Sequence, residues 1–326
     1  MKDPIFICGH RKSGTTVFHN LFDGHPELMV YPSDLNLLYA YFPVYTSDSF
    51  TDEERRKRLK KVLFDDLEFQ LKQEGISDCI DIENLSKLFF NQIQGADLRD
   101  MKIVISALMN AYGQLTDSLH KIPLIKETSI EIYAREIFEW FPNARFLHLV
   151  RDPRDNFAAL KAGVATYYAE MGEDEKQTLA SLIYRTRLGL EMGKVNASRY
   201  GLEAYRFVNF NQLVKNVDLI MEELSAFLGI EFTDSLFKPT RLGQPFRGNN
   251  FDGNKFSQVS NKNVDRWKER ISEDEAQIIE FHLGPLMIEF DYTLSFSREE
   301  CSDMAADFYK WENYKYFYSD RFEKLR

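Results

Sequence analysis

Four short apolar runs, separated by longer segments of helical periodicity, constrain the fold of this chain most strongly. The runs are Pro4–Cys8, Ile122–Ile125, Arg145–Val150 and Tyr205–Phe210. Apolar runs of this length, bounded by turn-forming residues, are typical of strands that are covered on both faces. Strands that alternate with helices form parallel βαβ units. The sequence therefore predicts an α/β fold in which a central parallel β-sheet is flanked by helices.

Helical segments lie between these runs. Thr51 precedes three acidic residues, and the apolar side chains between positions 59 and 71 share one face of a helix that continues to about residue 73. Ser272 begins a similar pattern that continues to Phe290. A capping residue followed by acidic side chains is typical of a helix N-terminus. Because no internal repeat and no linker rich in proline, glycine and serine divides the chain, we expect a single domain over residues 1–326.

The charge balance and the cysteine content limit the partners and the compartment. Lys and Arg number 41 against 51 Asp and Glu, a formal net charge of −10. This balance argues against general nucleic-acid binding but allows an anionic small molecule in a local basic pocket. Cys8, Cys79 and Cys301 lack the paired spacing of a disulfide framework or a zinc site, so we expect a reducing, cytoplasmic location and no metal. No apolar stretch approaches 18 residues, so no membrane span is expected.

A glycine-containing loop follows the first apolar run. The loop, Gly9–Thr16 (GHRKSGTT), leads into a helical run, and the order of strand, loop and helix N-terminus is one that binds phosphate groups. The spacing of Gly9 and Gly14 matches the P-loop pattern, but Thr15 stands where a P-loop has lysine. Basic side chains lie inside the loop instead. The candidate phosphate-binding residues are Arg11, Lys12, Ser13, Gly14, Thr15 and Thr16.

The absence of that lysine bears on the kind of nucleotide. A nucleoside triphosphate requires Mg²⁺ and usually a second strand that ends in a metal-binding aspartate, and the sequence contains no convincing candidate for that strand. The loop therefore favours a different nucleotide that carries a 5′-phosphoryl group. A P-loop kinase that acts on a small molecule and a capped helix without a ligand are the alternatives.

A second basic motif follows the third apolar run. Arg151 stands where that run ends, in the sequence RDPRD, and Pro153 fits the first turn of the helix that follows. Ligands bind at the carboxyl edge of a parallel sheet, and an arginine there can hold a phosphate with two hydrogen bonds. The alternative is a surface salt-bridge cluster among Arg151, Arg154 and the neighbouring aspartates.

Together the two motifs resemble those of the sulfotransferases that use 3′-phosphoadenosine 5′-phosphosulfate (PAPS). RKSGTT is similar to the loop that surrounds the 5′-phosphosulfate in that family, and RDPRD is similar to its 3′-phosphate site. The resemblance spans about residues 4–292. Weaker similarities in the family's order are a His-Pro-acid segment at 22–27, KET at 126–128, NFNQL at 209–213, DRWK at 265–268 and a closing pattern at 286–292.

The resemblance implies a fold, a reaction and a co-substrate. The fold would be a P-loop-like, three-layer α/β fold. The reaction would transfer the sulfuryl group of PAPS to a hydroxyl or amine of an acceptor and release adenosine 3′,5′-bisphosphate (PAP), with no metal required. Lys12 would neutralise the bridging oxygen of the leaving phosphate, and the other loop residues would surround the 5′-phosphate.

Three departures make the chain more similar to the bacterial, glycosaminoglycan and tyrosylprotein types than to the cytosolic aryl and steroid branch. Ala159 stands where the family usually has a serine that binds the 3′-phosphate, and no histidine follows Lys126. Asn211 and Gln212 replace the Glu-Asp pair of the later motif. The resemblance then implies that Arg151 binds the 3′-phosphate together with Arg247 and the Gly248 amide. A catalytically inactive protein that binds PAPS or PAP is a further alternative.

Two carboxylates are candidates for the general base. Asp34 follows the His-Pro segment at a spacing close to that of glycosaminoglycan-type enzymes, and Glu127 stands beside Lys126, the family's catalytic lysine position. Asp34 would otherwise cap a helix at residues 35–42, and Glu127 would otherwise pair with Lys126. A histidine base, for example His10 in the loop, is also open.

The acceptor-binding helices are expected at residues 36–120 and 161–200. Aromatic residues make up 14% of the chain, and those in these segments favour a hydrophobic alcohol or phenol over a saccharide, with ordinary core packing as the alternative. Residues 297–326 carry aromatic side chains at helical spacing. This spacing predicts a C-terminal helix that packs on the body, closes the acceptor pocket or contacts a second copy in a homodimer.

Overall fold

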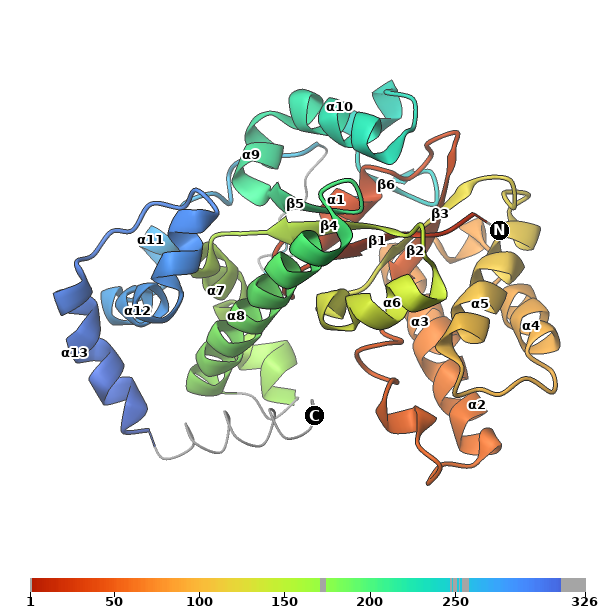
Figure 1. Cartoon of the computed structure of the whole chain (residues 1–326), viewed down its shortest axis with the longest axis horizontal. Coiled ribbons are helices and arrows are strands. Elements are labelled where there is room, and N and C mark those ends of the chain that lie inside the picture. Colours follow the sequence, from red (N-terminus) through yellow and green to blue (C-terminus); the bar gives the residue numbers. More distant parts are fainter. Residues whose placement is uncertain are drawn as a thin grey trace.

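A five-stranded parallel sheet forms the centre of the computed structural model, which describes residues 2–170, 174–246, 248, 251, 253 and 258–311 (Figure 1). The strands are β1 (Ile5–Cys8), β2 (Leu28–Asp34), β3 (Ile122–Lys126), β4 (Arg145–Val150) and β5 (Tyr205–Asn209). Their order across the sheet is β2-β3-β1-β4-β5. Helices cover both faces, so the predicted three-layer α/β fold is confirmed.

The helices divide between the two faces of the sheet. One face packs on α1, α9 and α10, and the other packs on α2 to α6 (Figure 1). A third apolar cluster joins α7, α8, α12 and α13. The helices are α1 (Thr15–Asn20), α2 (Asp52–Lys60), α3 (Asp66–Glu74), α4 (Ile82–Gln92), α5 (Met101–Leu115), α6 (Ala134–Trp140), α7 (Pro153–Lys161), α8 (Glu175–Tyr200), α9 (Phe210–Lys215), α10 (Val217–Leu228), α11 (Trp267–Arg270), α12 (Glu273–Glu289) and α13 (Arg298–Tyr309).

Short elements complete the fold. Two strands, β6 and β7, pair in antiparallel fashion apart from the main sheet. The short strands and the 3₁₀ or π-helical turns are η1 (Val44–Thr46), η2 (Lys61–Asp65), η3 (Ser77–Cys79), η4 (Ile130–Tyr133), η5 (Val164–Tyr168), η6 (Asp234–Phe237), β6 (Thr240–Arg241) and β7 (Gln244–Pro245).

Burial on both faces explains the unbroken apolar run of β1. Phe6 and Cys8 lie in the apolar cluster on one side of the sheet, and Ile5 and Ile7 lie in the cluster on the other side. Successive side chains of a strand alternate between faces. Because both faces are covered, every position of β1 is apolar or weakly polar.

Strand β2 is the element that the sequence patterns miss. Pro32 lies inside it, and a proline within an apolar run usually argues against a strand. β2 lies at the edge of the sheet and pairs with β3 alone, where a missing N–H donor is tolerated. Asp34 ends this strand and residues 37–43 form bends and turns, so the helix cap at Asp34 and the helix after it are wrong.

Capping boxes explain two predicted helices. The side chains of Thr51 and Ser272 each accept a hydrogen bond from the backbone N–H of the glutamate three residues later. The side chain of each glutamate in turn accepts the backbone N–H of the capping residue. These helices therefore begin at Asp52 and Glu273, as predicted. The first does not continue unbroken to residue 73, because the π-helical turn η2 separates α2 from α3.

The predicted C-terminal helix is described in part. α13 begins after its cap Ser297, and Phe308 lies in the same apolar cluster as Leu283 of α12. Residues 312–326 lie outside the described residues, so the aromatic contact that they were predicted to make stays a prediction, as does the single-domain organisation. None of the helices described is long and apolar enough to cross a bilayer.

Candidate active site

A cavity of about 760 Å³ lies at the carboxyl ends of the strands. The loop after β1, the last residues of β2 and β3, and the first residue after β4 all line it. Ligands bind at this edge in open parallel sheets, and the volume is within the range of small-molecule sites. The predicted site residues that line the cavity are Arg11, Lys12, Gly14, Thr15, Thr16, Asp34, Lys126, Arg151 and Gly248.

The loop between β1 and α1 is shaped by residues in the left-handed region. The φ angles of Gly9, Lys12 and Gly14 are 139°, 62° and 100°. A Cβ on Gly14 would overlap the ring of Phe210, so the position needs glycine for space as well as for its dihedral angle. Non-glycine residues seldom adopt a positive φ, and such backbone concentrates at functional sites. α1 begins directly at Thr15, which leaves its first N–H groups without helical partners.

Asn156 of α7 holds this loop in place, a role that no sequence pattern indicated. Its side-chain nitrogen donates to the carbonyl oxygen of Arg11 at 2.8 Å, and its Oδ1 lies 3.1 Å from Nδ1 of His10. Burial, and then the charge of Arg185, lowers the pKa of His10 well below its usual value. Ser13 is buried within the loop, does not line the cavity, and its hydroxyl has no hydrogen-bond partner among the described residues.

Lys12 brings its ammonium group to the cavity. Its Nζ lies 3.9 Å from the ring centroid of Phe251, which also lines the cavity. Burial, and then the charge of Lys126, lowers the pKa of Lys12 to about 8. A lysine with such a pKa can exchange a proton close to physiological pH.

Asp34 and Lys126 end two neighbouring strands and are register partners of β2 and β3. Lys126 forms an ion pair with Oδ2 of Asp34, and the backbone N–H of Thr128 donates to Oδ1 at 3.3 Å. The side chain of Lys126 is 4% exposed, whereas that of Asp34 is 20% exposed. The carboxylate of Asp34 is therefore oriented by its neighbours and still accessible from the cavity.

Glu127 has a different environment. It is fully buried and does not line the cavity. Its carboxylate accepts the backbone N–H groups of residues 37–39 at 2.6–3.2 Å, and burial raises its pKa to about 8. The alternative pairing with Lys126 is not formed, since Lys126 pairs with Asp34. Glu127 thus organises the turn after β2, and this geometry makes it the weaker of the two candidates for the base.

Arg151 lines the cavity beside the phosphate loop. It donates to the carbonyl oxygens of Lys12 at 2.8 Å and Asn263 at 3.1 Å, and its guanidinium carbon lies 4.9 Å from the ring centroid of Phe210. Its Nε is buried and has no hydrogen-bond partner among the described residues. The surface salt-bridge alternative therefore does not describe Arg151. The predicted partner Arg247 lies outside the described residues.

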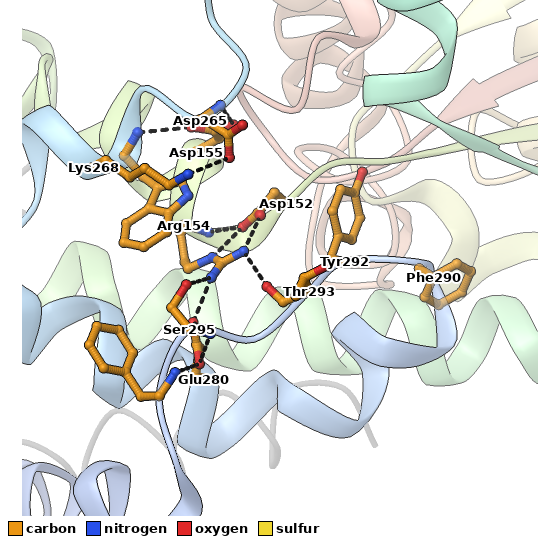
Figure 2. A network of polar contacts seen from close by, with 12 residues as sticks. Asp152, Arg154, Asp155, Asp265, Lys268, Glu280, Phe290, Tyr292, Thr293 and Ser295 are labelled. Carbon is orange, nitrogen blue, oxygen red and sulfur yellow. Dashed lines mark hydrogen bonds and ion pairs between the residues drawn. The ribbon is translucent and has the colours of Figure 1, made fainter.

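Arg154, three residues later, belongs to a buried ion-pair network (Figure 2). Its guanidinium donates to Asp152 at 2.6 Å and to Glu280 of α12 at 2.5 Å, and all three side chains are at most 4% exposed. The RDPRD motif therefore divides into two parts. Arg151 serves the cavity, and Arg154 attaches α12 to the start of α7.

Asp155, in the same motif, positions a second basic segment. It accepts the backbone N–H groups of Asp265 at 2.8 Å and Trp267 at 2.9 Å. Between and after these two residues, Arg266 and Arg270 line the cavity, and Arg266 lies close enough to Arg151 for their charges to interact. The similarity of DRWK to the family's closing pattern was the only sequence signal for this segment.

A profile of the sulfotransferase family matches residues 4–234 of the sequence. The chain belongs to the sulfotransferase family. Because this match includes both basic motifs, the alternative of a P-loop kinase has no support beyond the shared loop shape. A search of curated proteins finds no match.

Two solved sulfotransferase domains show the same fold. The domain from the curacin biosynthetic pathway is 17% identical, with a TM-score of 0.55, and the match covers 90% of this chain and 99% of that chain. The domain from the Synechococcus PCC 7002 olefin synthase is 19% identical, with a TM-score of 0.56, and the match covers 90% and 98% of the two chains. Retinol dehydratase in complex with androsterone and PAP, at 12% identity and a TM-score of 0.41, is too distant to carry an argument about ligands.

The cavity of this sulfotransferase is basic, although the whole chain is acidic. Among the described residues, the acidic side chains that line it are Asp34, Glu74 and Asp155. Two of these are already in ion pairs, with Lys126 and Arg241. The basic side chains that line it are Arg11, Lys12, Lys126, Arg151, Arg185, Arg241, Arg266 and Arg270.

Two of these arginines, Arg185 in α8 and Arg241 in β6, had no sequence signal. Each comes from an element whose cavity-facing side depends on long-range packing.

In this sulfotransferase the histidine candidate for the base is His19 rather than His10. His10 does not line the cavity, whereas His19 of α1 does. Burial, and then the charge of Lys126, lowers the pKa of His19 to about 3. Its ring is therefore neutral at pH 7. The side chain of His19 is buried, whereas the side chain of Asp34 is 20% exposed, which makes Asp34 the more accessible of the two candidates.

Proposed function

We propose that this sulfotransferase transfers the sulfuryl group of PAPS to a hydroxyl or amine of an acceptor and releases PAP. The observation that supports this most directly is that Lys12, Arg151 and Asp34 line one cavity at the carboxyl edge of the sheet. The basic side chains of the phosphate loop suit the 5′-phosphosulfate of PAPS, and Arg151 suits its 3′-phosphate. The carboxylate of Asp34, at the end of β2, can accept the proton that the acceptor must lose.

The proposed transfer follows from the charges at the loop. As the bond between the sulfur and the bridging oxygen breaks, its electron pair stays on the 5′-phosphate of PAP, and negative charge grows there. The Lys12 ammonium and the Arg11 guanidinium lie in the loop that would surround this phosphate. Fixed positive groups stabilise such charge without reorganising.

Asp34 is the proposed general base. The acceptor oxygen forms the new bond to sulfur while its proton passes to the carboxylate of Asp34. The ion pair with Lys126 and the bond from the Thr128 amide hold this carboxylate in one orientation. Positioning of this kind accounts for a large share of catalysis in group transfer.

The 3′-phosphate site is proposed around Arg151. Its buried Nε has no described partner, and Arg266, Arg270 and Gly248 line the same cavity. The family's usual serine donor is missing here, because its position is occupied by Ala159. The arginines can replace this donor, since an arginine side chain can hold a phosphate with two hydrogen bonds.

The acceptor is proposed to be a small hydrophobic alcohol or phenol. The cavity walls include the aromatic rings of Tyr39, Tyr167, Tyr168, Phe246 and Phe251, and such rings bind apolar surface while leaving a hydroxyl free to react. A saccharide acceptor, as in the glycosaminoglycan type, is the competing proposal. We also propose a cytoplasmic location and a homodimer.

Binding and transfer together test this function. The thermal midpoint should rise with PAP in the absence of Mg²⁺ and should not rise with ATP and Mg²⁺. A screen with ³⁵S-labelled PAPS over phenols, sterols, sugars and peptides should then find labelled product, and Lys12→Ala should abolish the label while the protein stays folded.

The outcomes separate the alternatives. Stabilisation by PAP without transfer to any acceptor would indicate a catalytically inactive nucleotide-binding protein. Stabilisation by ATP with Mg²⁺ alone would overturn the proposal in favour of a kinase. Full activity of Lys12→Ala would show that the loop does not act on the leaving phosphate.

A further inference from the structure

Three metal-ligating side chains lie together in the core below the phosphate loop. Cys8 ends β1, Glu131 lies in η4, and His148 lies in β4. All three are at most 2% exposed, and one ligand atom from each lies within 4.8 Å of the other two. Cys8 and His148 are register partners in neighbouring strands, which places their side chains on the same face of the sheet. None of the three lines the cavity described above.

The carboxylate of Glu131 is the second observation. Its Oε2 is buried and has no hydrogen-bond partner among the described residues. A buried polar atom without a partner is costly, and a bound ion is one of the arrangements that would satisfy it. The cysteine and the histidine that lie within 4.8 Å of this glutamate are both good metal ligands.

Helix α8 leaves space for this cluster at two glycines one turn apart. A Cβ on Gly189 would overlap the Glu131 carboxylate, and a Cβ on Gly193 would lie 2.7 Å from Nδ1 of His148. Glycine inside a helix costs about 0.5–1 kcal/mol relative to alanine. The chain accepts this cost twice at the positions that face the cluster.

Neighbouring polar groups hold the ligands in place. The hydroxyl of Tyr205 lies 2.8 Å from Nδ1 of His148, and the side chain of Asn196 donates to the carbonyl oxygen of Glu131 at 2.8 Å. Groups of this kind orient the ligands of metal sites and tune their affinity.

We propose that Cys8, Glu131 and His148 bind one divalent transition-metal ion of the zinc class, in a structural role. Thiolate, imidazole and carboxylate are ligand types that Zn²⁺ takes at about 2.0–2.3 Å, and with three protein ligands the fourth tetrahedral position would take a water molecule. Ca²⁺ and Mg²⁺ do not fit, because they prefer oxygen ligands alone. A thiolate and a carboxylate also offset the two positive charges of the ion.

The position of the site indicates what the ion does. Cys8 directly precedes Gly9, the first residue of the phosphate loop. An ion bound there ties the start of the loop to β4 and to η4. It would stabilise the base of the loop without contact with the nucleotide.

Metal content and metal titration test this proposal. The full chain, purified without a histidine tag, should contain about one equivalent of zinc by plasma mass spectrometry. After removal of the metal with a chelator, Zn²⁺ should raise the thermal midpoint. Co²⁺ should produce the absorption of a tetrahedral site together with a thiolate-to-cobalt charge-transfer band. Absence of retained metal, of a thermal shift and of the cobalt spectrum would overturn the proposal and leave a metal-free network of neutral groups.

Matched variants locate the site. Cys8→Ser should remove the charge-transfer band, and Glu131→Gln should weaken Co²⁺ binding at least about tenfold while the band persists at saturation. Cys79→Ser, at an exposed cysteine, is the control and should change neither. If Cys8→Ser fails to fold, Glu131→Gln still decides. Unchanged Co²⁺ affinity in Glu131→Gln, or loss of the band in Cys79→Ser, would place the metal elsewhere.

Discussion

At the scale of single residues, two lysines in the same cavity differ because their neighbours differ. Lys126 forms an ion pair with Asp34. The ammonium of Lys12 instead lies over the ring of Phe251, and burial lowers its pKa to about 8. Lys126 is therefore suited to orient the base, and Lys12 is suited to receive an anionic leaving group. Residue type alone does not separate these two roles.

The reaction rate should report the pKa of Lys12. The proposed role needs the charged ammonium, which the free enzyme loses as the pH rises through about 8. The value of kcat/KM for PAPS should therefore fall above this pH, and kcat should fall only at higher pH, because a bound anion raises the pKa. Initial rates at limiting and saturating PAPS measure both profiles. Lys12→Arg is the control, since arginine keeps its charge; an unchanged alkaline limb in that variant would assign the limb to another group.

Asp34→Asn should lower turnover by about 10²–10⁴-fold at saturating PAPS, because the amide keeps the shape of the carboxylate but does not accept a proton. Glu127→Gln is the comparison, and its main effect should be on the midpoint of urea unfolding, because its amide nitrogen would face backbone N–H donors. A larger loss of turnover in folded Glu127→Gln would reverse the two roles. If both variants keep more than about a tenth of the turnover, His19 or the substrate accepts the proton.

Arg151→Ala should weaken PAP binding by about 10–100-fold, the effect of losing a charge-assisted hydrogen bond. Binding of adenosine 5′-phosphate, which lacks the 3′-phosphate, should weaken much less. Isothermal titration of both nucleotides measures the difference, with Arg135→Ala, at an exposed arginine, as the control. Equal weakening of the two nucleotides by Arg151→Ala would rule out the 3′-phosphate role.

At the scale of elements, the segment after β4 joins the sheet to the C-terminal helices. The side chain of Asp152 accepts the backbone N–H of Arg154 and so caps α7, and Arg154 reaches Glu280 in the middle of α12. The two oxygens of Glu280 also accept the backbone N–H of Ser295, in the segment between α12 and α13. The buried Arg154 thus connects α7 to α12 and to the segment between α12 and α13 (Figure 2).

Arg154→Met should destabilise the protein by roughly 3–5 kcal/mol, because it leaves buried carboxylates without their partner. The free energy of unfolding in urea measures this loss. Arg135→Met is the matched control: its ion pair with Glu139 is exposed, so its loss should cost at most about 0.5 kcal/mol. A similar small effect of both substitutions would show that the buried network adds little stability.

At the scale of the whole molecule, the net charge of −10 and the basic cavity coexist because the positive side chains are concentrated at one sheet edge. Screening by salt shortens the reach of exposed charges. A small anion in the cavity interacts with nearby cations, whereas a long anionic polymer would also meet the acidic remainder of the surface. The charge distribution therefore favours a nucleotide over a nucleic acid.

The affinity for PAP should fall severalfold between about 50 mM and about 500 mM salt, because the ligand is bound largely through charge. An oligodeoxynucleotide should show no measurable binding at either salt concentration. Titration followed by fluorescence or calorimetry measures both. Tight, salt-sensitive binding of the oligodeoxynucleotide would contradict the reading of the charge distribution.

Much of the candidate site is local in sequence and could be predicted from it. The loop Gly9–Thr16 and Arg151 each follow a buried strand directly, and the carboxyl ends of parallel strands meet at one edge. Chain connectivity therefore brings these residues to one cavity without knowledge of the packing. Asp34 was named for its spacing, although the strand that carries it was missed because Pro32 interrupts the pattern.

The sequence by itself determined the strand-and-loop framework, the residues of the phosphate loop and the arginine at the end of β4, because backbone pattern and position along a strand set these. Only the tertiary structure decided which carboxylate reaches the cavity, where Arg154 goes, and that Cys8 meets Glu131 and His148. The physical reason is that these partners are far apart in the chain. Their contacts depend on how helices cross the sheet and on which side chains the core has room to bury.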